Sequence, residues 1–270
     1  MTLLDKVEPL SKGQEEFMEA LKSEDYDIIG VFGPTGTGKS LLSICYGIDS
    51  VTSGKYKRFI ISRPVVDVVT GREVTAVEAG KLYFELASQY LRDILEGILE
   101  WKEVLKMLDE GKVVFADTHY LRGRTFDNSI VFIDDTQAMP PESVLEILVR
   151  MGRNSRLIIA GDPIFQKTAY HIRIDSATLL RNILLGEERA KVVDLGLKDI
   201  VRPGARRGIK LFFEAVMRKR ELNDIETKIL DSAHVNAPDA DIVTVIEFIE
   251  AKKTFEIKSE HTPDALIIVK

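Results

Sequence analysis

The amino-acid sequence predicts an α/β protein in which helices cover both faces of a mainly parallel central sheet. Short apolar segments bounded by turn residues alternate along the chain with longer amphipathic segments, which is the pattern of strands alternating with helices. The apolar segments are rich in Val and Ile and almost continuously hydrophobic, as strands buried on both faces should be. With 45% hydrophobic and 30% charged residues, the chain of 270 residues has the composition of a globular protein.

The individual elements follow from this alternation. Strands are predicted at residues 27–32, 59–62, 113–116, 129–134, 156–160 and 191–195. Helices are predicted in the longer amphipathic segments, at residues 11–21, 39–51, 75–94, 98–109, 141–151, 176–184 and 205–220. Together these elements form one α/β domain over residues 1–220.

The pattern changes after residue 220. Asn236, Ala237, Pro238 and Asp239 form a loop signal, and alternating β-like stretches follow at residues 242–249, 254–257 and 265–269. We therefore expect residues 221–270 to form a small β-rich C-terminal extension, whose role the sequence does not indicate.

Cysteine content and hydropathy bound the cellular setting. The single cysteine, Cys45, excludes an internal disulfide, and the N-terminus lacks the basic-then-apolar pattern of a secretory signal. The longest apolar runs are shorter than the roughly 20 residues that a membrane-spanning helix needs. We expect a soluble, cytoplasmic protein with no membrane partner and with Cys45 in the core.

Charge is unevenly distributed along the chain. The net charge of -6 argues against a protein that coats nucleic acid by bulk positive charge, although it permits a local basic patch. Basic residues, Arg156 among them, crowd positions 150 to 220. For most of them we expect solvated positions on helix faces.

The strongest motif lies directly after the first predicted strand and before a predicted helix. Residues 33–40 read GPTGTGKS, which matches G-x-x-x-x-G-K followed by Ser or Thr, the phosphate-binding loop or P-loop. The glycines let backbone N–H groups point at the β-phosphate, Lys39 neutralises the β- and γ-phosphates, and the Ser40 hydroxyl ligates Mg²⁺. The predicted cofactors are therefore ATP and Mg²⁺. We assign nucleotide binding to Gly33, Pro34, Thr35, Gly36, Thr37, Gly38, Lys39, Ser40 and the following Leu41.

A P-loop needs a carboxylate from a neighbouring strand to hold the metal. The strand at residues 129–134 supplies it, because Asp134 emerges at its carboxyl end, where ligands bind in open α/β sheets. Asp134 is the predicted metal-side residue, beside Ser40. Asp135 is placed to orient or deprotonate the attacking water. The alternative for Asp135 is a helix N-cap ahead of Pro140.

A third strand, at residues 156–160, ends in Gly161-Asp162-Pro163, with Gln166 a few residues further on. Polar side chains at this position can sense the γ-phosphate. Gly-Asp-Pro is equally a good turn sequence, so both interpretations stay open from the residues alone.

With these residues in place, the chain resembles the PhoH-like ATPase family, whose core is similar to that of superfamily 1 helicases. The resemblance runs from about Gln14 to about Ala215. It is carried by GPTGTGKS at 33–40, SRPVV at 62–66, YLRGRTFDNSIVFIDDTQ at 120–137, LVRMGRNSRLIIAGDPIFQ at 148–166 and DIVRP at 199–203. It implies a RecA-like P-loop NTPase fold, a three-layer sandwich around the sheet.

The resemblance also implies roles for single residues. Gln14 matches the glutamine that reads adenine, and Arg63 falls in the family's Arg-Pro after the second strand. Arg122 and Arg124 lie in its Arg-Gly-Arg-Thr stretch, where Tyr120 is equally suited to base stacking and to packing.

Three further residues receive catalytic roles by the same resemblance. Gln137 and Gln166 look like groups that sense the γ-phosphate or the water, and Arg202 sits where an arginine finger acts on its own or a neighbouring subunit's phosphate. The resemblance further implies hexameric rings and, in some members, RNA unwinding. The predicted partners are RNA or single-stranded DNA and further copies of the chain.

Two departures from the family pattern stand out. The family usually has Glu where this chain has Asp135, so the predicted base is one methylene shorter and slow hydrolysis is expected. Residues 67–81, DVVTGREVTAVEAGK, keep little of the family's pattern there.

The leading functional hypothesis is an ATP-driven motor or switch that acts on RNA or single-stranded DNA. A small-molecule phosphotransferase and a nucleotide-gated scaffold with nearly vestigial hydrolysis are the alternatives. ATP is expected rather than GTP, because no Asn-Lys-x-Asp guanine-reading motif occurs and Gln14 suits adenine.

Overall fold

The computed structural model describes residues 2–66, 73–117, 124–140, 148–162 and 176–208, together with Ser143 and Glu146. The chain divides into two compact units, Met1–Val201 and Arg202–Lys270, and residues 202–208 are the described part of the second. The predicted extension at residues 221–270, and the boundary predicted at residue 220, lie outside the described residues and stay predictions.

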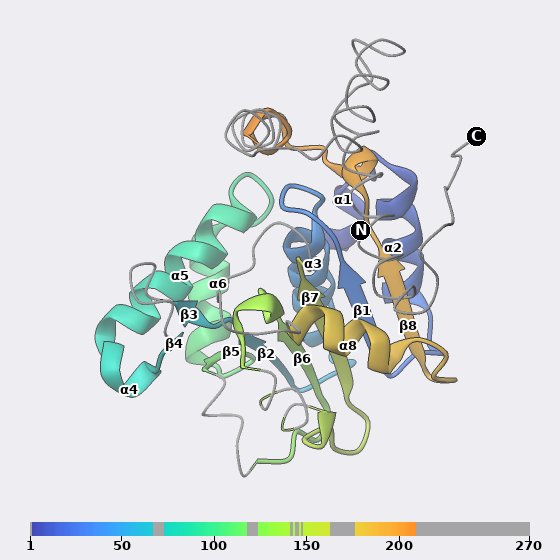
Figure 1. The fold of residues 1–270 in the computed structure, drawn as a ribbon. Coiled ribbons are helices and arrows are strands. Elements are labelled where there is room, and N and C mark those ends of the chain that lie inside the picture. The colour runs from blue at the N-terminus through green and yellow to red at the C-terminus, as the bar shows by residue number, and fades with distance from the viewer. Residues whose placement is uncertain are drawn as a thin grey trace, which may run out of the picture. The chain divides into compact units, whose positions relative to one another are not determined.

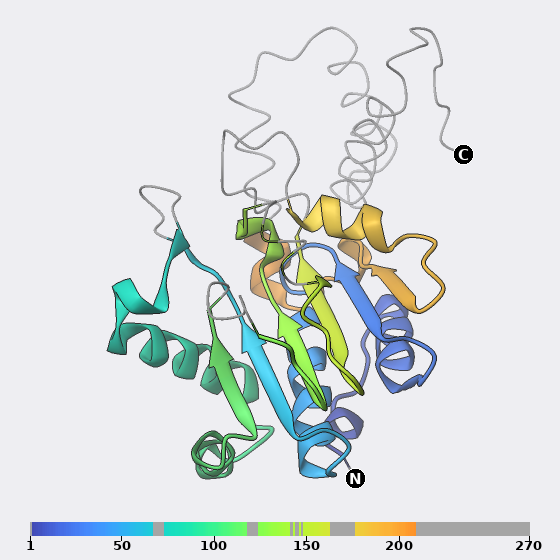
Figure 2. The same cartoon turned by 90° about the horizontal axis from the view of Figure 1, so that it is seen from below.

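A six-stranded sheet forms the centre of the first unit (Figures 1 and 2). Its strands are β1 (Ile28–Phe32), β2 (Arg58–Ser62), β5 (Val113–Ala116), β6 (Ser129–Ile133), β7 (Arg156–Gly161) and β8 (Ala190–Asp194). Their order is β5-β2-β6-β7-β1-β8, and every neighbouring pair is parallel. The six predicted strands are confirmed to within one or two residues at their ends. Because all strands point the same way, their carboxyl ends meet at one edge of the sheet.

Helices and short elements connect the strands. The helices of the first unit with described bounds are α1 (Leu3–Lys6), α2 (Lys12–Lys22), α3 (Lys39–Thr52), α4 (Ala76–Ala79), α5 (Lys81–Leu95), α6 (Trp101–Asp109) and α8 (Ser176–Leu184). The short elements are the antiparallel pair β3 (Val65–Val66) and β4 (Glu73–Val74) and the 3-10 turns η1 (Thr136–Ala138) and η2 (Leu197–Asp199). The sequence pattern did not predict α1, β3, β4 or either 3-10 turn, which are all too short to carry a periodicity.

Two hydrophobic clusters cover the two faces of the sheet. Side chains alternate between them along each strand: Phe132 of β6 belongs to the cluster built with α3, and Ile133 belongs to the cluster built with α8. The strands are thus buried on both faces, and the predicted three-layer α/β arrangement is confirmed. Cys45 lies fully buried in the α3 cluster, as expected, where burial raises the pKa of its thiol to about 12.

Three helix predictions were partly wrong. The helix expected at residues 75–94 is broken into α4 and α5, because Gly80 has φ of 54° and ψ of -127°, a conformation open to glycine. The helix expected from residue 98 begins only at Trp101, after Gly97 with φ of 75°. The helix expected at 141–151 lies partly outside the described residues, and residues 149–151 are not helical.

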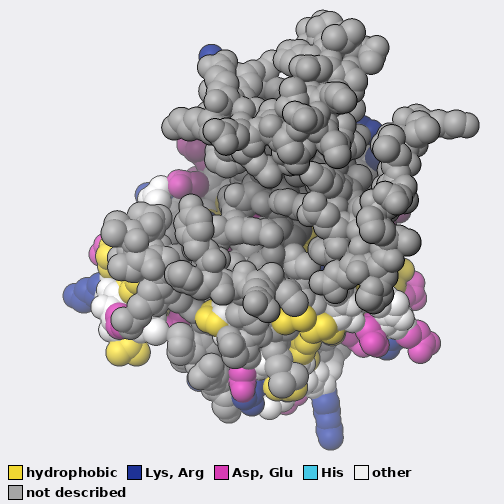
Figure 3. Space-filling view, viewed as in Figure 1, with side chains coloured by type: hydrophobic (Ala, Val, Ile, Leu, Met, Phe, Trp, Pro, Cys, Tyr) yellow, Lys and Arg dark blue, Asp and Glu magenta, His cyan; other side chains and the backbone are white. Residues whose placement is uncertain are grey.

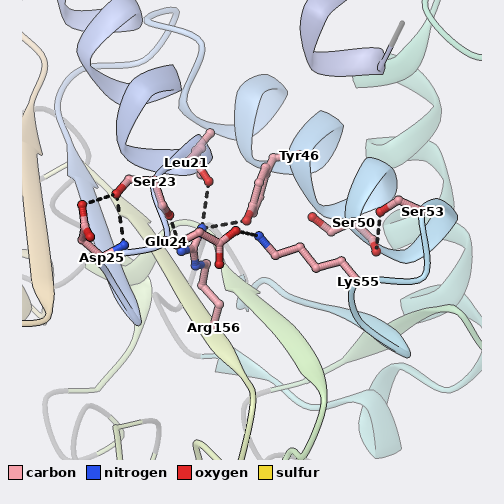
Figure 4. Close-up of polar contacts among 9 residues, drawn as sticks. All are labelled: Leu21, Ser23, Glu24, Asp25, Tyr46, Ser50, Ser53, Lys55 and Arg156. Carbon is pink, nitrogen blue, oxygen red and sulfur yellow. Dashed lines mark hydrogen bonds and ion pairs between the residues drawn. The ribbon is translucent and has the colours of Figure 1, made fainter.

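Arg156 is buried rather than solvated, which corrects the expectation for this basic residue. Figure 4 shows its guanidinium pointing at the end of α2, where it donates to the carbonyl oxygens of Leu21 and Ser23 at 2.8 and 2.5 Å. It also donates to the hydroxyl of Tyr46 on α3 at 2.7 Å. The last carbonyls of a helix have no partner within the helix, so Arg156 satisfies them and ties α2 and α3 to β7.

Replacing Arg156 by methionine is expected to lower the free energy of unfolding by about 2–3 kcal/mol. The change removes three hydrogen bonds and leaves buried carbonyl oxygens without their donor, although it fills a similar volume. Urea denaturation of the full chain measures the loss. The matched control is Arg189→Met, because Arg189 pairs with Asp27 at an exposed position and should contribute below about 1 kcal/mol. Equal losses in the two variants would contradict the assignment.

The surface of the first unit carries exposed apolar side chains over α4 and α5, where hydrophobic groups are visible in Figure 3. They are Val77, Leu82, Phe84 and Leu86, and Val77 is 91% exposed. Within the described ranges, no helix is both long and apolar enough to cross a membrane.

Candidate nucleotide and magnesium site

The P-loop joins the carboxyl end of β1 to the first residue of α3. Its curl depends on glycine, because Gly36 and Gly38 have φ of 84° and 89°, in the left-handed region. Gly33 is required for a different reason: a Cβ there would stand 2.3 Å from the carbonyl oxygen of Leu195. The loop is further held by the Thr37 hydroxyl, which donates to the carbonyl of Pro34 at 2.9 Å.

Lys39 points back into this loop from the start of α3. Its Nζ donates to the carbonyl oxygens of Gly33 and Pro34 at 2.7 and 2.8 Å, and the residue is only 8% exposed. An ammonium group held here bonds phosphate oxygens more strongly than carbonyl oxygens, because the acceptor is then charged. The geometry thus places the predicted phosphate-neutralising charge inside the curl of the loop.

Ser40 and Asp134 meet across the sheet edge, although 94 positions separate them in the sequence. The Ser40 hydroxyl donates to Asp134 Oδ2 at 2.6 Å, and Asp134 follows directly after β6 and is 3% exposed. Hydroxyl and carboxylate oxygens are the hard ligands that Mg²⁺ takes beside phosphates and water, so the pair fits this metal. Both residues predicted for the metal are therefore brought together.

Burial and the neighbouring Asp135 raise the pKa of Asp134. Hydrogen bonds from Ser40 and Tyr90 and the positive charge of Arg63 act in the opposite direction. A divalent cation at this place would favour the charged carboxylate, because opposite charge stabilises the ionised form.

Asp135 lies beside Asp134 with both of its carboxylate oxygens in hydrogen bonds. Arg63 Nε donates to Oδ2 at 2.6 Å, and Gln137 Nε2 donates to Oδ1 at 3.1 Å. The side-chain oxygen Oε1 of Gln137 in turn accepts from the backbone N–H of Asp162 at 2.9 Å, just after the end of β7. Asp135 occupies the N-cap position of η1, where its side chain makes no capping bond, and the start of the helix expected after Pro140 lies outside the described residues.

Tyr90 of α5 joins the site, and sequence reasoning missed it. Its hydroxyl donates to Asp134 Oδ2 at 2.5 Å, and the Arg63 guanidinium lies 4.6 Å from the centre of its ring. Burial and the charge of Asp134 raise the pKa of Tyr90 well above its usual value, so the phenol keeps its proton and acts as the donor. A tyrosine on the inward face of a helix resembles any core residue in the sequence, and only the approach of α5 to α3 and to the end of β6 distinguishes this one.

Gln14 of α2 is buried against the P-loop. Its Nε2 donates to the carbonyl of Thr37 at 2.9 Å, and its Oε1 accepts from the N–H of Leu10 at 2.8 Å. A Cβ added at Gly38 would stand 2.8 Å from Gln14 Nε2, so the two residues fit closely. The structure thus brings Gln14 to the loop, while its reading of adenine stays a prediction.

The remaining predicted residues divide by position. Thr35 lies within the loop, and Leu41 lies in the first turn of α3. Arg124 is exposed beyond the end of β5, whereas Gln166, Arg122 and Tyr120 lie outside the described residues. Arg202 is the first residue of the second unit, and its predicted role as an arginine finger remains untested.

A glycine-rich loop of this kind, facing a parallel strand that ends in an aspartate, is characteristic of P-loop nucleotide-binding proteins. The fold and the Ser40–Asp134 contact place the chain in that class. Comparison with known proteins then identifies the family: the profile described as PhoH-like protein matches residues 6–214. The chain belongs to the PhoH-like protein family, and the resemblance is confirmed.

Individual relatives agree with this assignment. A PhoH-like protein of Bacillus subtilis (strain 168) is 30% identical over 193 residues, which cover 70% of this chain and 58% of the relative. A PhoH-like protein of Synechocystis sp. is 28% identical over 205 residues, which cover 70% and 56%. The matched part of the chain thus spans little more than half the length of these relatives.

Solved structures are less similar. The DUF1998 helicase MrfA bound to DNA aligns with a TM-score of 0.42 and 14% identity, over 69% of this chain and 26% of that chain. At this score the likeness carries no argument about function, and the fold assignment rests on the strand order and the loop geometry given above.

Proposed function

We propose that the protein is a magnesium-dependent ATPase that works at the P-loop. The observation that carries the proposal is the 2.6 Å contact between Ser40 and Asp134, with the Lys39 ammonium inside the adjacent loop. Two oxygens that would ligate Mg²⁺ and one cation that would contact the phosphates lie together at the carboxyl edge of the sheet, which supports phosphoryl transfer there. Magnesium bound there would neutralise charge that develops on the β- and γ-phosphates.

Asp135 is the proposed base or orienting group for the attacking water. Arg63 and Gln137 each take one acceptor site on its two oxygens, so release of Arg63 would leave Oδ2 freer to accept from the attacking water. This arrangement supports slow basal hydrolysis that rises when Arg63 is engaged elsewhere. Gln137, Gln166 and Arg202 are the further groups proposed to sense or stabilise the γ-phosphate.

The choice of ATP over GTP rests on the position of Gln14 at the base of the loop. An amide side chain can pair with the edge of adenine through one donor and one acceptor. A comparison of ATP and GTP turnover by the purified protein tests this part, and equal turnover would remove the adenine-reading role.

Coupling to RNA or single-stranded DNA is the second part of the proposal. Arg63 is 45% exposed at its side chain, so it is accessible to a phosphodiester backbone. A backbone phosphate that takes up Arg63 would release Asp135, which connects nucleic-acid binding to hydrolysis.

Addition of single-stranded RNA or DNA is therefore expected to raise ATP turnover at least about fivefold, the lower range of typical coupling between sites. The effect should weaken steeply as salt is raised, because released counterions dominate such binding. A coupled-enzyme assay at low and high salt measures both. Turnover that is the same with and without nucleic acid at low salt, together with no binding, would contradict the coupling but not the ATPase.

A nucleotide-gated scaffold remains the second candidate, favoured by the engagement of both Asp135 oxygens. Its signature is ATP binding with negligible turnover across all nucleic acids tested. A phosphotransferase would instead transfer the γ-phosphate of labelled ATP to an acceptor other than water.

A further inference from the structure

Asp134 Oδ2 accepts hydrogen bonds from two different helices. Ser40 donates from the start of α3 at 2.6 Å, and Tyr90 donates from α5 at 2.5 Å. The other oxygen, Oδ1, accepts from the backbone N–H of Asp135 at 3.0 Å. Every oxygen of this carboxylate is thus oriented by a donor, and Tyr90 is the one donor that belongs neither to the P-loop helix nor to the segment after β6.

The ring of Tyr90 is itself held in place. It packs against the hydrophobic cluster that contains α3, and the guanidinium of Arg63 lies on it at 4.6 Å. Arg63 continues to Asp135, to which it donates at 2.6 Å. A tyrosine fixed in this way has little rotational freedom, so its hydroxyl can hold the carboxylate in one orientation.

We propose that Tyr90 is a positioning residue for the magnesium site. Its hydroxyl holds the Asp134 carboxylate facing Ser40, so that the Ser40 hydroxyl oxygen and the Asp134 carboxylate oxygen are arranged before the metal binds. The inference rests on the proposed function, because it concerns the same metal site. Partners that orient a metal-binding carboxylate from behind typically change metal affinity by about 10- to 100-fold when they are removed. Without the phenol, Asp134 keeps Ser40 as its only side-chain donor among the contacts described above.

Tyr90→Phe is the sharpest test, because it removes the hydroxyl and keeps the ring that contacts Arg63. Magnesium is titrated by calorimetry into the full chain saturated with a non-hydrolysable ATP analogue. The expected result is a magnesium dissociation constant raised at least about tenfold, while the affinity for the analogue without magnesium stays close to that of the unmodified protein. A loss confined to magnesium affinity distinguishes the positioning role of Tyr90 from a general loss of structure, which would weaken the binding of both magnesium and the analogue.

Tyr46→Phe is the matched control. This change also removes a tyrosine hydroxyl that takes part in a buried hydrogen bond, the one from Arg156 at 2.7 Å. Tyr46, however, belongs to the network in which Arg156 ties α2 and α3 to β7. The magnesium affinity of Tyr46→Phe should equal that of the unmodified protein. A Tyr90→Phe variant with unchanged magnesium affinity, or with equal losses for magnesium and analogue, would overturn the inference. If the unmodified protein binds no magnesium in the presence of the analogue, the proposed magnesium-dependent function is wrong. That result differs from one in which the unmodified protein binds magnesium and Tyr90→Phe binds it equally well, which would overturn only the role of Tyr90.

Discussion

Replacing Lys39 by alanine is expected to reduce ATP turnover on the order of a thousandfold or more, the largest effect of any single change in this chain. The ammonium is the charge that the P-loop offers to the β- and γ-phosphates, and it is held inside the loop by two carbonyl oxygens. A loss of three powers of ten corresponds to about 4 kcal/mol of transition-state stabilisation. Phosphate release by the purified variant, at saturating ATP and magnesium, measures it.

Lys22→Ala is a suitable control for this experiment. Lys22 lies at the end of α2, where its ammonium pairs with Asp5 at an exposed position. Exposed pairs contribute little, so neither turnover nor stability should change appreciably. If Lys39→Ala retained turnover like Lys22→Ala, the assignment of the P-loop as the active site would be withdrawn.

Replacing Asp134 by asparagine is expected to reduce turnover by about two to three powers of ten and to weaken the magnesium requirement. Asparagine has the same shape. Its oxygen can accept from the Asp135 N–H, and its amide can donate to the hydroxyls of Ser40 and Tyr90. The substitution therefore removes mainly the negative charge that the metal needs. Turnover measured against magnesium concentration separates loss of metal binding from loss of structure.

The same variant should show an opposite effect on stability in the absence of magnesium. Burial raises the pKa of Asp134 in the folded protein, so its ionised form opposes folding at neutral pH, and this penalty disappears as pH falls through the folded-state pKa. Asp134→Asn is thus expected to melt no lower than the unmodified protein near pH 7. A lower melting temperature would show that the carboxylate serves structure rather than metal binding.

Asp49→Asn provides the complementary control. The Asp49 carboxylate accepts from the backbone N–H groups of Leu3 and Leu4 at 2.7 and 2.8 Å and so anchors α1 to α3. Its replacement should lower the melting temperature while turnover per folded molecule stays unchanged. If Asp134→Asn lowers turnover without lowering the melting temperature, and Asp49→Asn does the reverse, then Asp134 serves function and Asp49 serves stability.

Local signals account for the success of the sequence at the P-loop. The requirement for glycine at Gly36 and Gly38 is local, since it arises from positive φ at those residues themselves. The six strands were equally predictable, because burial on both faces demands a continuous apolar run of Val and Ile. Asp134 could be placed at the sheet edge for the same reason, since it ends such a run.

Elements that depend on a single residue's backbone were less predictable. The break between α4 and α5 comes from the conformation of Gly80, and the amphipathic pattern continues across it. A glycine inside a helical pattern is tolerated often enough that its presence alone does not predict a break.

By itself, the sequence determined the parallel α/β class and the P-loop, and it singled out Lys39, Ser40 and Asp134 as the residues that we propose to work there. Only the tertiary structure decided that Tyr90 donates to Asp134, that Arg63 holds Asp135, and that the basic residue Arg156 is buried. The physical reason is how far apart in the sequence the interacting residues lie. Strand burial and loop curvature are encoded by neighbouring residues, whereas a hydrogen bond between α5 and the end of β6 requires the whole sheet to bring distant segments together.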